Sequence, residues 1–94
     1  MHYQLIRTYG EPQSGPVMMP ATEQLQTART LLGVGSISQV QTVAHEDDYQ
    51  VFAVANAKDY ALENPAGRLA AAQASGGELD RALFGPVLIF YLAE

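Results

Sequence analysis

The sequence predicts an α+β domain whose strands and helices follow one another in the order β-α-β-β-α-β. Segments rich in β-branched and aromatic residues alternate with two segments whose apolar residues have helical spacing. The last segment, residues 87–92, is a continuous apolar run behind the turn dipeptide Gly85-Pro86. This order matches a ferredoxin-like two-layer sandwich, with both helices on one face of a four-stranded, mainly antiparallel sheet.

Residues 2–9 are rich in aromatic and β-branched side chains and end at Gly10, which predicts a first strand. Residues 10–20 contain three prolines and two glycines and are predicted to form a loop. The loop carries the apolar side chains of Val17, Met18 and Met19. They either pack against the core as a lid or contact a partner.

Helix signals open the next segment, in which Thr22 is a plausible N-cap and Gly33 a C-terminal stop. Between them, the apolar positions of one helical face are Leu25, Ala28 and Leu32. Residues 37–44 and 49–55 flank a polar turn and predict a β-hairpin.

A second helix is predicted to begin at Asn64-Pro65, with asparagine as the cap and proline at the first helical position. It ends at Gly76-Gly77, and residues 78–84 could add one helical turn. Ala66, Leu69, Ala70 and Gln73 are predicted to lie on one face of this helix.

The last strand must be covered on both faces, because successive side chains of a strand point to opposite sides of the sheet. In a ferredoxin-like sheet this strand lies at an edge, and only one face of the sheet meets the helices. One apolar set would then stay uncovered in a monomer. A second subunit could pack on Val87, Ile89 and Tyr91, or the proline-rich loop could cover them.

Composition indicates a soluble globular protein forming one domain, residues 1–94, with 48% hydrophobic residues and no cysteine. No apolar run approaches the ~18 residues of a membrane span, and the N-terminus lacks a signal-peptide pattern. We therefore expect a cytoplasmic protein without membrane contact. The formal net charge of −5 argues against general nucleic-acid binding. It leaves room for a small anionic ligand, since four of the five basic residues are arginines.

Two local groups of residues could bind ligands. The run His45-Glu46-Asp47-Asp48 could hold a divalent cation, but it is predicted to be a solvated hairpin turn, so no metal site is expected. Asn64 either caps a helix or helps to form an anion site at its N-terminus, with Arg68 one turn along and Tyr60 ready to stack on a ring.

Other arginines could join this anion site. Arg7 and Arg29 would contribute only if the fold brings them close, and whether they converge with Arg68 and Arg81 is the geometric question that the sequence leaves open. No serine lies in a nucleophile motif, and no phosphate-binding glycine loop occurs. The sequence therefore predicts a non-enzymatic protein without a cofactor.

Short pieces of the chain resemble the DUF3846-like proteins, small domains of unknown function encoded largely by phages, plasmids and related mobile elements. The resemblance spans roughly residues 22–92 and rests on Leu25-Gln26, Gly35-Ser36-Ile37, Asn64-Pro65-Ala66 and residues 84–89. The glycine-rich Gly33-Val34-Gly35 and the long segment 78–82 depart from the family pattern. The resemblance implies a mobile-element origin and supplies no catalytic residues.

These observations predict a small oligomeric binding protein that acts against host defence, for example by sequestering a nucleotide-type signal between subunits. The alternative is an interaction module that inhibits a host enzyme or regulator through its acidic surface or its methionine-bearing loop.

Overall fold

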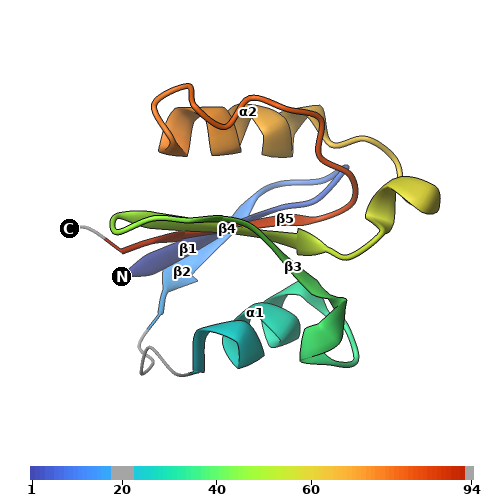
Figure 1. The fold of residues 1–94 in the computed structure, drawn as a ribbon, viewed down its shortest axis with the longest axis horizontal. Coiled ribbons are helices and arrows are strands. Elements are labelled where there is room, and N and C mark those ends of the chain that lie inside the picture. The colour runs from blue at the N-terminus through green and yellow to red at the C-terminus, as the bar shows by residue number, and fades with distance from the viewer. Residues whose placement is uncertain (18–22, 93–94) are drawn as a thin grey trace.

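The computed structural model describes residues 1–17 and 23–92. They form a five-stranded antiparallel sheet with a helix on each face (Figure 1). The strand order is β2-β1-β5-β4-β3. The strands are β1 (His2–Ile6), β2 (Gln13–Pro16), β3 (Val40–His45), β4 (Tyr49–Val54) and β5 (Val87–Tyr91), and the helices are α1 (Gln24–Leu32) and α2 (Pro65–Ala74). The predicted α+β class is confirmed.

Strand β5 lies at the centre of this sheet, hydrogen-bonded to β1 on one side and to β4 on the other. Its side chains alternate between two cores. Leu88 and Phe90 pack with Ala28 and Leu32 of α1, and the Phe90 ring meets Phe52 edge-on at 5.4 Å between centroids. The apolar run is therefore covered on both faces by the chain's own elements.

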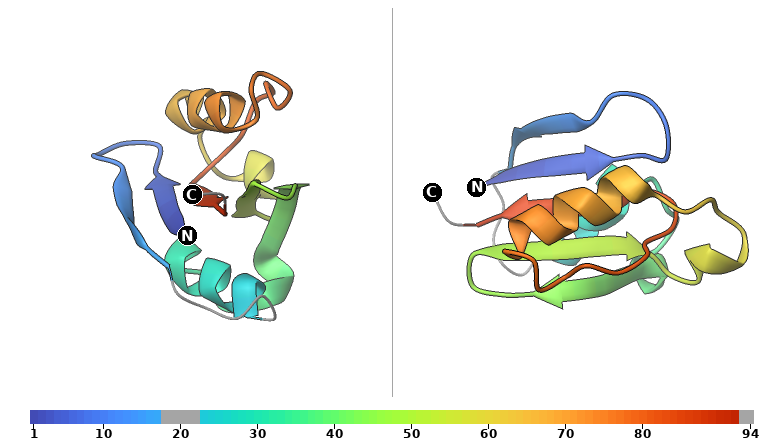
Figure 2. Two further views of the ribbon diagram at one scale, coloured as in Figure 1. Left: turned by 90° about the vertical axis from the view of Figure 1, so that its left-hand side faces the viewer. Right: turned by 90° about the horizontal axis from the view of Figure 1, so that it is seen from above.

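Helix α2 covers the opposite face of the sheet (Figure 2, left). There Val87 and Ile89 are fully buried beneath Ala70 and Ala71. The expectation that these two side chains form a subunit interface is wrong in its premise, because β5 is a central strand and not an edge strand. Tyr91, the third residue of that expected interface, is half-buried, stacks on His2 and donates a hydrogen bond to Gln4.

The side chain of Asn64 ties α2 to the sheet. Its Nδ2 donates to the backbone oxygens of Ile6 and Gly85, each at 2.8 Å, and its Oδ1 accepts from the Gly67 backbone N–H at 2.9 Å. Asn64 is 0% exposed. Asn64 therefore acts as the helix cap, and both its amide nitrogen and its amide oxygen are engaged in these bonds.

Close packing of α2 on β5 depends on Gly67. A Cβ atom at this position would lie 2.6 Å from Cγ2 of Val87 and 2.9 Å from Nδ2 of Asn64, closer than real side chains approach. Gly67, Ala70 and Ala71 form the buried stripe of α2. Of the four residues expected to share one face, Ala70 is buried, whereas Ala66, Leu69 and Gln73 are exposed.

Strand β2 corrects the expected four-stranded sheet, because residues 13–16 pair with β1 where a loop was expected. The sequence did not indicate this strand, because Gly15 and Pro16 are both poor strand formers. Proline is tolerated at a sheet edge, where β2 lies. Val17 is buried against the α1 face, whereas Met18 and Met19 fall outside the described residues.

The ferredoxin-like arrangement is not confirmed, because the helices lie on opposite faces and every strand pair in the described chain is antiparallel. The hairpin is confirmed, but it starts later than expected: Ile37–Gln39 forms a 3-10 helix with a capping box from Ser36. Residues 78–84 form an extended return segment, not the suggested helical turn.

No described helix has the length and apolar character required to cross a membrane.

Replacing Asn64 with alanine should lower the free energy of unfolding by about 3 kcal/mol, since the helix cap is lost and buried carbonyls lose their donor. Asn64→Asp keeps the acceptor for Gly67 but sets an oxygen against the carbonyls of Ile6 and Gly85, so it should also destabilise. Urea denaturation measures both. Stability unchanged in Asn64→Asp would contradict the role assigned to the two donated bonds.

Gly67→Ala should destabilise the protein, because overlap with Val87 outweighs the ~1 kcal/mol that alanine gains in a helix. Val87→Ala removes Cγ2, the nearest atom, but Cβ of residue 87 and Nδ2 of Asn64 would still lie 2.9 Å from the new methyl group, so in this background the same substitution should cost less without becoming neutral. A double-mutant cycle by urea denaturation tests this coupling. Additive effects of the two substitutions would show that α2 does not approach β5 this closely.

Candidate functional site

A cleft of about 350 Å³ opens on the α2 face of the sheet, since its lining includes Val43 and Leu83 of the core beneath α2. Its floor comes from β3 and β4, with Gln41, Val43 and the buried Ala53. Its walls are the return segment Arg81–Phe84 and the 3-10 helix Ala57–Asp59 that follows β4. The volume lies at the lower end of the range for small-molecule sites.

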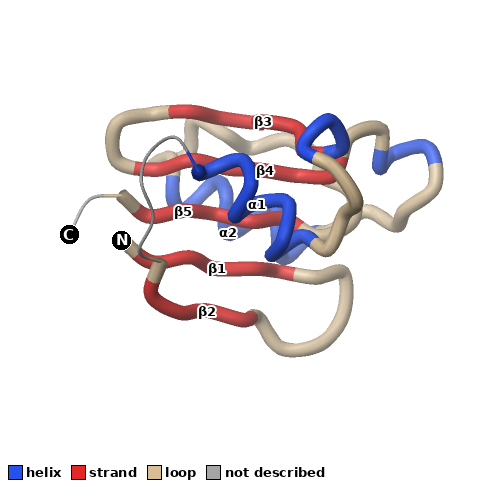
Figure 3. Tube along the Cα trace, turned by 90° about the horizontal axis from the view of Figure 1, so that it is seen from below, coloured by secondary structure: helices blue, strands red, loops and turns tan. Residues whose placement is uncertain are grey.

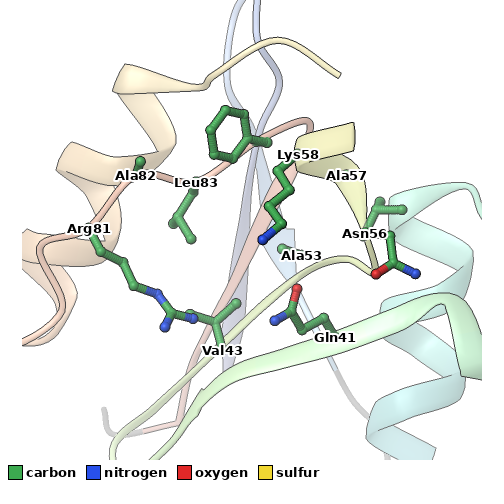
Figure 4. A pocket seen from close by; sticks show the side chains of 11 residues that line it. Gln41, Val43, Ala53, Asn56, Ala57, Lys58, Arg81, Ala82 and Leu83 are labelled. Carbon is green, nitrogen blue, oxygen red and sulfur yellow. The ribbon is translucent and has the colours of Figure 1, made fainter. Parts of the chain in front are cut away.

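Two cationic side chains reach into this cleft from different walls. Figure 4 shows the ends of Lys58, Arg81 and Gln41 directed into the same space above the floor. Lys58 and Arg81 make no ion pair within the described residues. The cleft lining contains no carboxylate, although the chain carries ten acidic residues. The site is thus locally positive in an acidic protein.

The rest of the lining combines hydrogen-bonding and apolar groups. Gln41 and Asn56, both exposed, contribute amide groups to the lining. Val43, Leu83 and Phe84 provide apolar surface, and Leu83 is only 5% exposed. Such a lining can hold an anionic group at the cations while a flat or apolar part of the same molecule contacts the walls.

A backbone feature shapes one wall of the cleft. Asn56 has a φ of 60°, and it is the one residue other than glycine with positive φ in the described chain. This left-handed conformation turns the chain out of β4 into the 3-10 helix that carries Lys58. Asparagine tolerates it better than most residues, and such positions are enriched at functional sites.

The bulge in β3 shapes the floor. The register with β4 shifts between Thr42 and Ala44, so one extra residue is accommodated in β3. As a result, Val43 and Ala44 both pack on the α2-face core instead of alternating. Val43 then stands beside Gln41 in the cleft.

None of the five residues expected to bind a ligand lines this cleft. Arg29 belongs to α1, on the opposite face of the sheet from α2, and donates to the Val34 backbone oxygen. Arg68 pairs with Asp80 at 2.7 Å, and this carboxylate raises the pKa of the guanidinium. Tyr60 and Arg7 are exposed and lie outside the cleft lining. Asn64 is buried and fully bonded.

Sequence reasoning missed Lys58, Gln41 and Asn56 entirely, and raised Arg81 only as part of the convergence question. None of these residues lies in a motif, and they come from three separate segments. The His45 run forms the end of β3 and the hairpin turn, with His45 Nδ1 3.1 Å from Gln50 Nε2. The described residues contain no cluster of three or more potential metal-ligating side chains.

Comparison with known proteins places the chain in no family: no family model, no curated protein and no solved structure matches it.

Asn56→Ala should lower the free energy of unfolding by about 1 kcal/mol, because alanine pays the steric cost of the left-handed conformation. Asn56→Gly keeps that backbone without the cost, and its stability should match the parent to within about 0.5 kcal/mol. Thermal unfolding of both variants tests the turn that carries Lys58. Equal losses in the two variants would mean that the amide side chain, and not the backbone conformation, stabilises this wall.

Proposed function

We propose that this chain is a non-enzymatic binding protein that holds a small anionic ligand of nucleotide type in the cleft between Lys58 and Arg81. The observation that carries the proposal is the convergence of two cations, neither of them ion-paired within residues 1–17 and 23–92, on a cleft whose described lining has no carboxylate. Arginine and lysine are the usual partners of phosphate oxygens.

The remaining lining fits the rest of such a ligand. The apolar surface of Val43, Leu83 and Phe84 suits the face of a planar ring, and the amides of Gln41 and Asn56 can pair with its polar edge. The volume of about 350 Å³ favours a single small molecule over a polymer. This agrees with the net charge of −5, which disfavours extended nucleic acid.

The biological part of the proposal rests on the resemblance to DUF3846-like proteins. We propose that the protein is encoded by a phage or mobile element, is cytoplasmic and acts against host defence by sequestering a nucleotide signal. A second candidate is an interaction module that inhibits a host protein. The exposed side chains of Tyr60, Leu62 and Leu69, each more than half accessible, favour it.

Titration calorimetry with ADP, AMP, inorganic phosphate and uncharged adenosine tests the proposal. We expect ADP to bind, and Lys58→Gln or Arg81→Gln to weaken it at least ~10-fold each, which corresponds to ~1.4 kcal/mol. Adenosine should bind more weakly than ADP.

Arg7→Gln is the matched control, since it removes an exposed cation that lies outside the cleft. It should leave ADP affinity unchanged to within about twofold, because surface charges act weakly at a distance. Equal losses in all three variants would indicate general charge attraction instead of a site. No heat with any phosphate compound would overturn the proposal and favour the protein target.

A further inference from the structure

Two neighbouring residues of the return segment carry opposite charges and have different surroundings. Asp80 accepts a hydrogen bond from Nε of Arg68 at 2.7 Å, whereas Arg81 lines the cleft. Arg81 makes no ion pair within the described chain, although a carboxylate stands next to it in sequence. That carboxylate is engaged by a cation of α2, which leaves the charge of Arg81 to the cleft.

Two carboxylates beside the cleft wall act on Arg68, and neither of them lines the cleft. Asp80 precedes Arg81 in sequence, and Glu63 stands opposite Phe84 in an isolated β-bridge. Asp80, through its hydrogen bond and its charge, raises the pKa of the Arg68 guanidinium, and Glu63 does so to a smaller extent. Arg68 therefore offsets negative charge that lies next to residues of the cleft wall.

The fold leaves this role to Arg68. It is the one basic residue of α2, and the return segment runs back beside this helix in the same layer (Figure 2, right). Arg29, in contrast, lies on α1, which covers the opposite face of the sheet (Figure 3). Among the basic residues in the helices, only Arg68 is placed to reach the return segment.

The ion pair with α2 is the one polar contact that residues 80–82 make within the described chain. The backbone of these three residues makes no hydrogen bond there. On one side the segment is fixed by the Leu79 N–H, which donates to Ser75 Oγ at 2.8 Å. On the other side the Leu83 oxygen accepts from the Asn64 N–H at 2.7 Å. Without the ion pair, the residues between these two points are free to rearrange.

We propose that Arg68 is a positioning residue for the cleft, which holds the Asp80 carboxylate on α2 and so keeps the Arg81 guanidinium unpaired and open to an anionic ligand. This role rests on the proposed function and refines it. The side chains of Arg68 and Asp80 are 43% and 60% exposed, so their ion pair adds little to stability. Loss of Arg68 should therefore affect ligand binding more than folding.

Arg68→Gln should weaken ADP binding roughly 3- to 5-fold in titration calorimetry, because the ligand must first displace Asp80 from Arg81. Arg7→Gln is the matched control, since it removes the same charge from an exposed site outside the cleft. It should change the affinity by less than about twofold. Asp80→Asn keeps an acceptor for Arg68 but has no charge to offer Arg81, so it should bind ADP at least as tightly as the parent.

The double variant Arg68→Gln/Asp80→Asn separates this role from a purely structural one. If Arg68 restrains the Asp80 carboxylate, removing that carboxylate restores the affinity lost in Arg68→Gln. If Arg68 only supports the backbone of the return segment, the double variant binds ADP as weakly as Arg68→Gln. Failure of the rescue would overturn the inference.

A measurement on the free protein keeps this test independent of the proposed ligand. In NMR spectra of the full chain, the guanidinium protons of Arg81 should exchange with solvent more slowly in Arg68→Gln than in the parent, because Asp80 then accepts from them. Circular dichroism confirms that each variant folds. Unchanged Arg81 signals would contradict the role of Arg68. If no phosphate compound binds but the Arg81 signals change as expected, the restraint of Asp80 stands and the proposed ligand is removed.

Discussion

Three hydrogen bonds of one buried amide hold helix α2 against the sheet. Asn64 reaches the end of β1 through Ile6, the turn before β5 through Gly85 and the first turn of α2 through Gly67. The Ile6 carbonyl is 58 residues away from Asn64 in sequence. Only an amide side chain offers donors for two carbonyls and an acceptor for an N–H at once. The placement of α2, and with it the space that α2 leaves free, depends on this contact.

The cleft is a consequence of that placement. Gly67 lets α2 settle directly on β5, so the helix covers the centre of the sheet and not β3. The chain must then return from the end of α2 to the start of β5, and it does so over the sheet along Arg81–Phe84. Burial changes along this wall: Arg81 and Ala82 are exposed, whereas Leu83 is buried. The positive cleft thus arises from packing, without any sequence motif.

The sequence allowed the α+β class, both helices, the hairpin and the double-sided burial of β5 to be predicted, because each depends on local propensity or periodicity. The strand order beyond the hairpin could not be predicted, since it depends on which elements pack together and not on any one segment. Val87 and Ile89 illustrate this. Their burial was expected, but the sequence suggested that a second subunit covers them, whereas α2 of the same chain does so. Asn64 and Arg68 were expected to face a ligand. In the structure the Asn64 side chain is buried within the fold, and the Arg68 guanidinium donates to Asp80.

The bulge at Val43 connects the site with the strand edge. By adding a second apolar side chain to the α2 face, it completes the floor of the cleft. The same extra residue breaks the alternation of outward backbone groups, so the regular outer edge of β3 ends at Thr42. Without the bulge, six residues of β3 would offer a long neutral edge, the kind that aggregates. The bulge therefore shapes the floor of the cleft and also limits the length of strand edge that another chain could extend.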